Sequence, residues 1–199
     1  MIQTYERPGY TIEFDDEAHR YITNGIITPS VSKLWSLKFD DYPNVPKAVL
    51  QAAADRGTAM HAAIERYEKN GEESDLQEFR NYLFLKKHFK VENIENEFPV
   101  AYFEDGLPIF AGTIDQVCRI DGAMAINDFK RVSAPNKEKI ALQVNLYRLA
   151  YMQTYGKDID KLSFMQLRED VRKFVPLPVQ EEQTKEFLKG ALENVGKRS

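Results

Sequence analysis

Residues 112–130 read GTIDQVCRIDGAMAINDFK, which is the pattern of two strands joined by a tight turn. Asp121-Gly122 is a dipeptide typical of two-residue β-hairpin turns. A symmetric turn there sets the register of both strands and pairs Ile120 with Ala123, Val117 with Ile126, and Asp115 with Asp128. The two carboxylates then face each other about 5 Å apart, where like charges are destabilising.

A divalent cation between Asp115 and Asp128 would convert this repulsion into a binding site. Lys130 lies two residues beyond Asp128 and therefore points from the same face of the strand. Two acids and a lysine at one point indicate metal-assisted attack on a phosphate. On spacing alone, the alternative is a solvated strand face with a chance pair of acids, which is common on exposed antiparallel sheets.

The composition is that of an ordinary soluble globular protein. The chain has 199 residues, of which 43% are hydrophobic and 29% charged, and we expect one domain. Cys118 is its single cysteine, which excludes a disulfide framework or a four-thiolate cluster within the chain. The polar N-terminus and the lack of a long apolar run predict neither a signal peptide nor a membrane span, hence a cytoplasmic protein.

The net charge of −4 does not favour a nucleic-acid partner, and it does not exclude one. Local basic clusters can still steer such a partner. There are two of them: Lys86, Lys87, His88 and Lys90, and then Lys130, Arg131, Lys137 and Lys139. In a chain this rich in charge, a solvated face is the alternative for each cluster.

The order of elements predicts a mixed α/β (α+β) fold in which helices flank a central sheet. The single domain, 1–199, divides into an N-terminal hairpin and short helix (1–45), a core (46–155), and closing strands with a helix (156–199). Strand patterns cover 10–28, 94–103, 109–120, 123–132, 162–168 and 173–179. Helical patterns follow Pro29-Ser30 and cover 47–69, 75–90, 133–155 and 181–195, with a loop at 40–46.

Two of these helices carry specific expectations. In the helix 47–69, Gly57 either breaks the helix, so that Thr58 caps a new one, or allows close packing against a strand. In the helix 75–90, the inward stripe is predicted to hold Leu76, Phe79, Leu83 and Phe84.

Several polar residues stand out on these elements. His61 is a lone helical histidine, a type that is usually structural or solvent-facing. Gln143 is a polar residue in an otherwise apolar helical row, and Tyr147 lies one turn further along the helix. Either Gln143 sits at the boundary with water, or the two residues form a polar pair that points toward a ligand phosphate. Glu95 and Glu97 share one face of a strand; a solvent-facing position is the simpler reading, and a position toward the metal site is the other.

Four separated segments together resemble the PD-(D/E)XK nuclease superfamily in its RecB-like exonuclease branch. They are Gly57-Thr58-Ala59-Met60-His61 (GTxxH), Gly112-Thr113-Ile114-Asp115 (GxxD), Asp128-Phe129-Lys130 (DxK) and Gln143-Val144-Asn145-Leu146-Tyr147 (QxxxY). The segment from His19-Arg20-Tyr21 to Pro29-Ser30-Val31 is also similar to phage-encoded members and to the mitochondrial genome maintenance exonucleases. Order and intervals match over residues 57–147.

The resemblance implies a restriction-endonuclease-like core that hydrolyses DNA with Mg²⁺ or Mn²⁺. It implies that His61, Asp115 and Asp128 bind the ion through side chains and Phe129 through its carbonyl, while Lys130 positions the attacking water. Gln143 and Tyr147 would shape the site and hold the DNA strand. Thr58, in the first segment, and Glu97, from the strand reading, are further candidates for shaping the site or binding DNA. A single cysteine places the chain outside the family's iron–sulfur subgroup.

The resemblance also implies DNA as partner and a place in phage or prophage recombination, repair or DNA processing, within a bacterial or phage-infected cell. No helicase domain is visible, so the chain acts alone or with a helicase or recombination protein. A non-catalytic binding module of the same fold and a site-specific endonuclease are the alternatives. Polarity, strandedness, DNA versus RNA, the number of metal ions and oligomeric state stay open.

Overall fold

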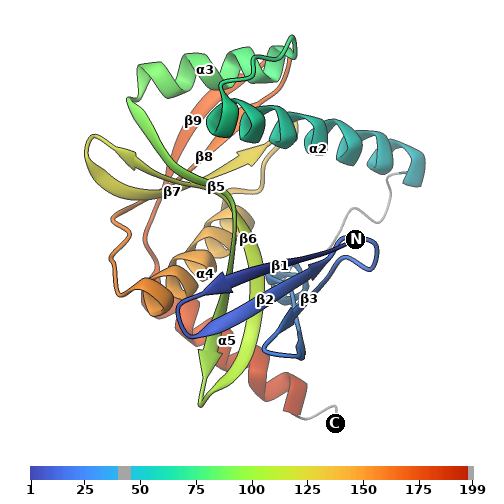
Figure 1. The fold of residues 1–199 in the computed structure, drawn as a ribbon, viewed down its shortest axis with the longest axis vertical. Coiled ribbons are helices and arrows are strands. Elements are labelled where there is room, and N and C mark those ends of the chain that lie inside the picture. Colours follow the sequence, from blue (N-terminus) through green and yellow to red (C-terminus); the bar gives the residue numbers. More distant parts are fainter. Residues whose placement is uncertain (40–45, 197–199) are drawn as a thin grey trace.

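A five-stranded mixed sheet forms the centre of the computed structural model, which describes residues 1–39 and 46–196 (Figure 1). Its strands follow the chain order from one edge to the other. Among these five strands, only the pair β7 and β8 is parallel, and the other three neighbouring pairs are antiparallel. The predicted central sheet is therefore confirmed, and it is mixed. The strands are β5 (Val91–Glu104), β6 (Leu107–Ile120), β7 (Ala123–Lys130), β8 (Lys161–Leu167) and β9 (Arg172–Leu177).

The β6–β7 hairpin forms in the predicted register. Asp121 and Gly122 have φ values of 51° and 79°, as a turn with two left-handed residues requires. The turn brings Ile120 opposite Ala123 and Val117 opposite Ile126, and the ladder ends at Gln116 and Asn127. It does not extend to Asp115 and Asp128, because the Asp115 carboxylate accepts the N–H of Phe129 instead, at 2.7 Å.

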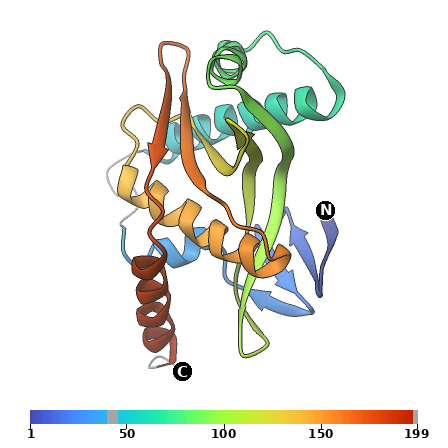
Figure 2. The same cartoon turned by 90° about the vertical axis from the view of Figure 1, so that its left-hand side faces the viewer.

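Helices cover both faces of the sheet (Figure 2). The sheet separates two hydrophobic cores, and strand β7 contributes to both. Ile126 packs in the core beneath α4, whereas Ala125 and Phe129 pack in the core beneath α2 and α3. This alternation is that of a strand buried on both faces. The helices are α1 (Val31–Trp35), α2 (Lys47–Asn70), α3 (Gln77–His88), α4 (Lys137–Tyr155) and α5 (Glu181–Gly196).

A separate four-stranded antiparallel sheet precedes the helices (Figure 1). Its strands are β1 (Ile2–Arg7), β2 (Tyr10–Asp15), β3 (Arg20–Thr23) and β4 (Ile26–Thr28). Tyr10, Ile12 and Tyr21 pack against Ala101 and Ala111 of the long β5–β6 hairpin. The predicted N-terminal hairpin is confirmed and gains β1, which the sequence pattern did not indicate.

Three expectations about the helices are corrected. Helix α2 runs unbroken through Gly57, and a Cβ at Gly57 would meet no atom within 4 Å, so neither a break nor close packing explains this glycine. Two residues of the predicted inward stripe of α3 are exposed: Leu76, at 37%, precedes the first turn, and Phe84, at 46%, has the guanidinium of Arg172 at 3.6 Å from its ring centroid. Helix α4 begins at Lys137, after Pro135, where the side chain of Asn136 caps it. The loop predicted at 40–46 lies almost wholly outside the described residues.

Two further observations bear on later experiments. No helix among the described residues is long and apolar enough to cross a membrane. Cys118, in β6, is fully buried, and burial raises the pKa of its thiol to about 12.

Candidate metal centre

Three side chains from separate elements converge at one point: His61 from α2, Glu97 from β5 and Asp115 from β6. One ligand atom of each lies within 4.8 Å of the others. His61 Nδ1 is 3.0 Å from Glu97 Oε1 and 3.8 Å from Asp115 Oδ1. The side chains are 26%, 32% and 11% exposed, so an ion from solvent can reach them.

The backbone of Glu97 explains why this residue turns toward His61. Its φ of 48° lies in the left-handed region, which a non-glycine residue rarely adopts. The β5–β6 ladder pairs Asn96 with Gln116 and Phe98 with Ile114, but it contains no pair between Glu97 and Asp115. Strain of this kind persists where surrounding structure imposes it, and it concentrates at functional sites.

Asp128 and Lys130 form a second pair beside this cluster. Lys130 Nζ donates to Asp128 Oδ1 at 2.8 Å and lies 2.7 Å from Oδ2. Asp128 is almost completely buried, at 1% exposure. Within the described residues, the group that can hold a metal contains His61, Glu97 and Asp115 but does not include Asp128.

The charges of the site act on one another. Burial alone would lower the pKa of His61. The carboxylates of Asp115 and Glu97 outweigh this effect and raise the pKa from 6.5 to about 9. Burial raises the pKa of Asp128 to about 7; Lys130 opposes this rise and the charge of Asp115 adds to it. An acid that resists ionisation beside a histidine that retains its proton indicates a site with too little positive charge when it is empty.

A buried polar network lies directly behind the acids. Gln116 follows Asp115, and Asn127 precedes Asp128. Asn127 Nδ2 donates to Gln116 Oε1 at 3.1 Å, and Gln116 Nε2 donates to the Tyr82 hydroxyl at 2.9 Å. Ser163 Oγ donates to Asn127 Oδ1 at 3.0 Å. These bonds cross strands β6, β7 and β8 and fix the positions from which the two acids project.

The residues predicted on the two helices are not members of this cluster, and their own contacts differ. Gln143 Nε2 donates to the Tyr147 hydroxyl at 3.4 Å, and Tyr147 is buried. A Cβ at Gly112 would lie 2.7 Å from Tyr147 Cε1, so this glycine makes room for the tyrosine ring. Thr58 is exposed on α2. The Phe129 ring lies edge-on to His61, with centroids 5.7 Å apart, and its carbonyl as a ligand stays a prediction.

Two residues that matter here were not assigned by the sequence or were assigned weakly. Glu97, for which a solvent-facing position was the simpler reading, contacts His61 directly. Asn96 donates from Nδ2 to the Asp115 carbonyl at 3.2 Å, and its buried Oδ1 has no hydrogen-bond partner. Alternation along a strand cannot predict either placement, since both depend on the irregular backbone at Glu97.

The donor set fits a divalent cation. Carboxylate oxygens suit Mg²⁺ and Mn²⁺, and an imidazole nitrogen shifts the preference toward Mn²⁺. The nearby carboxylates raise the pKa of His61, and a bound cation would take the place of the histidine proton between Glu97 and Asp115. A positive charge there would also favour the ionised form of Asp128, whose pKa is raised by burial. A His/Glu/Asp cluster that can bind a metal is therefore present, and the identity of the metal is a separate question.

Comparisons with known proteins show structural likeness only. No family model and no curated protein matches the chain. A crystal structure titled SSO0001 is 13% identical, with a TM-score of 0.42, over 82% of this chain and 74% of the other. An alkaline exonuclease from Laribacter hongkongensis is 9% identical, with a TM-score of 0.42, over 86% and 89%. At these scores neither likeness carries an argument about function, which has to come from the chain's own residues.

Proposed function

We propose that this chain is a metal-dependent nuclease of the PD-(D/E)XK type that hydrolyses DNA phosphodiester bonds and acts from strand ends. The observation that carries the proposal is the His61–Glu97–Asp115 cluster beside the Asp128–Lys130 pair. Three of the four sequence segments that resemble the RecB-like branch lie on α2, β6 and β7, which carry His61, Asp115 and the Asp128–Lys130 pair, and the fourth lies on α4.

His61, Glu97 and Asp115 would hold the ion, and Asp128 adjoins them. A bound Mg²⁺ or Mn²⁺ supplies a water of lowered pKa and neutralises charge on the scissile phosphate. Asp128 would accept a proton from an attacking water. Lys130 supplies a fixed positive charge beside the phosphate, and removing a single such donor costs about 3 kcal/mol of transition-state stabilisation.

The test is a cleavage assay on fluorescent single-stranded DNA with Mn²⁺ or Mg²⁺. We expect end-dependent shortening by the unmodified protein and a loss of at least about 10³-fold for Asp115→Asn, which is about 4 kcal/mol of barrier. Asp128→Ala should abolish cleavage as well. Asp121→Asn is the matched control, because this acid lies in the exposed hairpin turn of the same strand pair.

The outcomes separate the alternatives. Unchanged DNA with every ion would support a binding module without catalysis. Internal cuts that ignore blocked ends would support an endonuclease. Full Mn²⁺-dependent cleavage by Asp115→Asn would contradict the assignment of the metal centre.

A further inference from the structure

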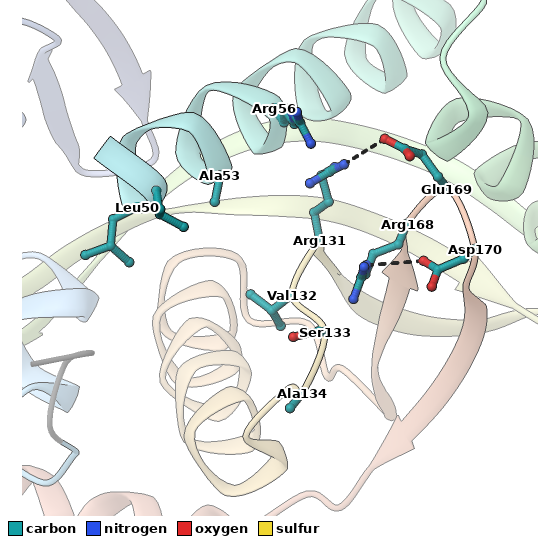
Figure 3. A pocket seen from close by; sticks show the side chains of 11 residues that line it. Leu50, Ala53, Arg56, Arg131, Val132, Ser133, Ala134, Arg168, Glu169 and Asp170 are labelled. Atoms are coloured by element: carbon teal, nitrogen blue, oxygen red, sulfur yellow. Dashed lines mark hydrogen bonds and ion pairs between the residues drawn. The ribbon is translucent and has the colours of Figure 1, made fainter. Parts of the chain in front are cut away.

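A groove of about 440 Å³ opens between helix α2, the segment that links β7 to α4, and the β8–β9 turn (Figure 3). This volume lies within the range of ligand sites in proteins, about 300–1,000 Å³. One wall is apolar and includes Leu50, Ala53 and Val132. The other carries three arginines, namely Arg56, Arg131 and Arg168.

The side chains of Arg56 and Arg131 point toward one another, although both are positive (Figure 3). Arg131 is anchored from behind, because its Nε donates to the buried carboxylate of Glu78 at 2.6 Å. That anchor leaves the outer edge of the Arg131 guanidinium facing Arg56. Two guanidinium groups held together in this way form a site for an anion between them.

The acids at the rim do not close the site. Arg131 contacts Glu169 at 3.1 Å and Arg168 contacts Asp170 at 3.3 Å, and both acids are more than 65% exposed. Exposed ion pairs of this kind contribute only about 0–1 kcal/mol. A phosphate, which accepts two parallel hydrogen bonds from a guanidinium, can therefore replace these carboxylates.

The groove adjoins the candidate metal centre through two elements. Arg131 directly follows Lys130, and Arg56 precedes His61 by five residues on the same unbroken helix. Five residues of α-helix rise about 7.5 Å along the axis and turn by about 140°, so Arg56 lines the groove while His61 faces the metal centre. A strand with its scissile phosphate at the metal centre would then extend along α2 toward the groove.

We propose that Arg56, Arg131 and Arg168 bind a phosphate of the nucleic-acid strand next to the scissile bond, with a sugar or base against the apolar wall. The place of this phosphate next to a scissile bond rests on the proposed nuclease function, whereas phosphate binding at the groove does not. The phosphate is either a terminal monoester or an internal diester, and these share the same chemistry.

The test measures binding without cleavage, by fluorescence anisotropy of labelled oligonucleotides in EDTA. We expect Arg56→Ala and Arg168→Ala each to weaken binding about 10-fold. Each should also reduce the slope of the logarithm of the binding constant against the logarithm of the salt concentration by the amount of about one phosphate contact. The matched control is Arg66→Ala on the same helix, where the arginine lies 3.8 Å from Glu72 and is 54% exposed outside the groove.

Oligonucleotides with a 5′-phosphate, a 3′-phosphate or free hydroxyl ends identify the source of the phosphate. Loss confined to one phosphorylated end supports a terminal phosphate, and equal loss for all three supports an internal one. Binding by Arg56→Ala and Arg168→Ala equal to that of Arg66→Ala would overturn the proposal, as would no binding by the unmodified protein.

The two proposals fail separately. If the unmodified protein cleaves DNA and the groove variants bind as tightly as the control, the groove is unrelated to the strand and the nuclease assignment stands. If the groove variants lose binding but no ion supports cleavage, the phosphate site stands and the nuclease assignment falls.

Discussion

Glu97 is the single residue on which the candidate metal centre most visibly depends. Its left-handed backbone, with φ of 48°, directs the carboxylate to His61 at 3.0 Å. Such a conformation costs about 1–3 kcal/mol for a non-glycine residue. The fold therefore maintains an unfavourable backbone at the position where the site needs an oxygen ligand.

This placement predicts that Glu97→Gln weakens Mn²⁺ binding by at least about tenfold, since even partners outside the ligand set cost 10–100-fold when removed. Isothermal titration calorimetry at pH 8 would measure the change. Glu95→Gln is the matched control, because Glu95 lies two residues away on β5 and is exposed. Equal losses in both variants would show that general charge, and not the ligand position, sets the affinity.

The two shifted groups also predict how stability depends on pH in the absence of metal. The pKa of His61 rises from 6.5 to about 9, so its contribution is complete below pH 6.5 and is lost toward pH 9. The pKa of Asp128 rises from 3.8 to about 7, so its contribution is lost between pH 4 and 7. Both trends run downward with rising pH.

We therefore expect the Tm in EDTA to fall by about 5–10 °C between pH 6 and pH 9, which corresponds to about 2–3 kcal/mol from His61. Differential scanning fluorimetry in matched ionic strength would measure it. His61→Gln should flatten the curve over this interval. A Tm that rises across the interval would contradict the protonated His61.

At the scale of elements, the two glycines of the motif segments have opposite surroundings. A Cβ at Gly57 meets nothing within 4 Å, whereas a Cβ at Gly112 lies 2.7 Å from Tyr147 and 3.2 Å from Val31. Gly57→Ala should stabilise the protein by about 0.5–1 kcal/mol through helix propensity. Gly112→Ala should destabilise it by about 1–3 kcal/mol through overpacking. Urea denaturation of both variants would test this pair, and the same sign for both would contradict it.

The sequence predicted the elements best where local chemistry decides them. The Asp121-Gly122 turn set the β6–β7 register, and Gly71 ended α2 with its φ of 74°. Strand β1 was missed because its residues are mostly exposed and carry no apolar alternation. Phe84 was wrongly predicted to point inward. The spacing of apolar residues along a helix cannot show that Arg172, which is distant in the sequence, lies over the ring of Phe84 on the surface.

The contacts at the candidate site were only partly predictable from the sequence. His61 and Asp115 lie 3.8 Å apart, which agrees with the family resemblance, and their role as ligands stays a prediction. The carboxylate of Asp115 also accepts the N–H of Phe129, and Asp128 pairs with Lys130. These choices depend on burial and on neighbouring charges. No pattern in one segment contains that information.

At the scale of the whole molecule, the candidate centre joins α2, β5 and β6, which are distant in the sequence. An ion bound there and absent from the unfolded chain stabilises the fold as a unit. We expect Mn²⁺ at about 100 times its Kd to raise the Tm at pH 8 by about 5–10 °C, from about 2.7 kcal/mol of linkage.

Thermal scans with and without Mn²⁺ measure this effect, and Glu97→Gln provides the comparison. The shift should shrink at pH 6, because protons then compete with the ion for His61. A shift of equal size in Glu97→Gln would place the ion elsewhere on the molecule.

The burial of Cys118 has a practical consequence for all of these measurements. Its thiol is inaccessible and holds its proton at any working pH, so it will not react with maleimides. A cysteine introduced at an exposed position such as Arg66 would then be the sole reactive one. With Cys118 left in place, this one substitution would allow a single dye or spin probe to be attached, and the probe could report the binding of a nucleic-acid strand in real time.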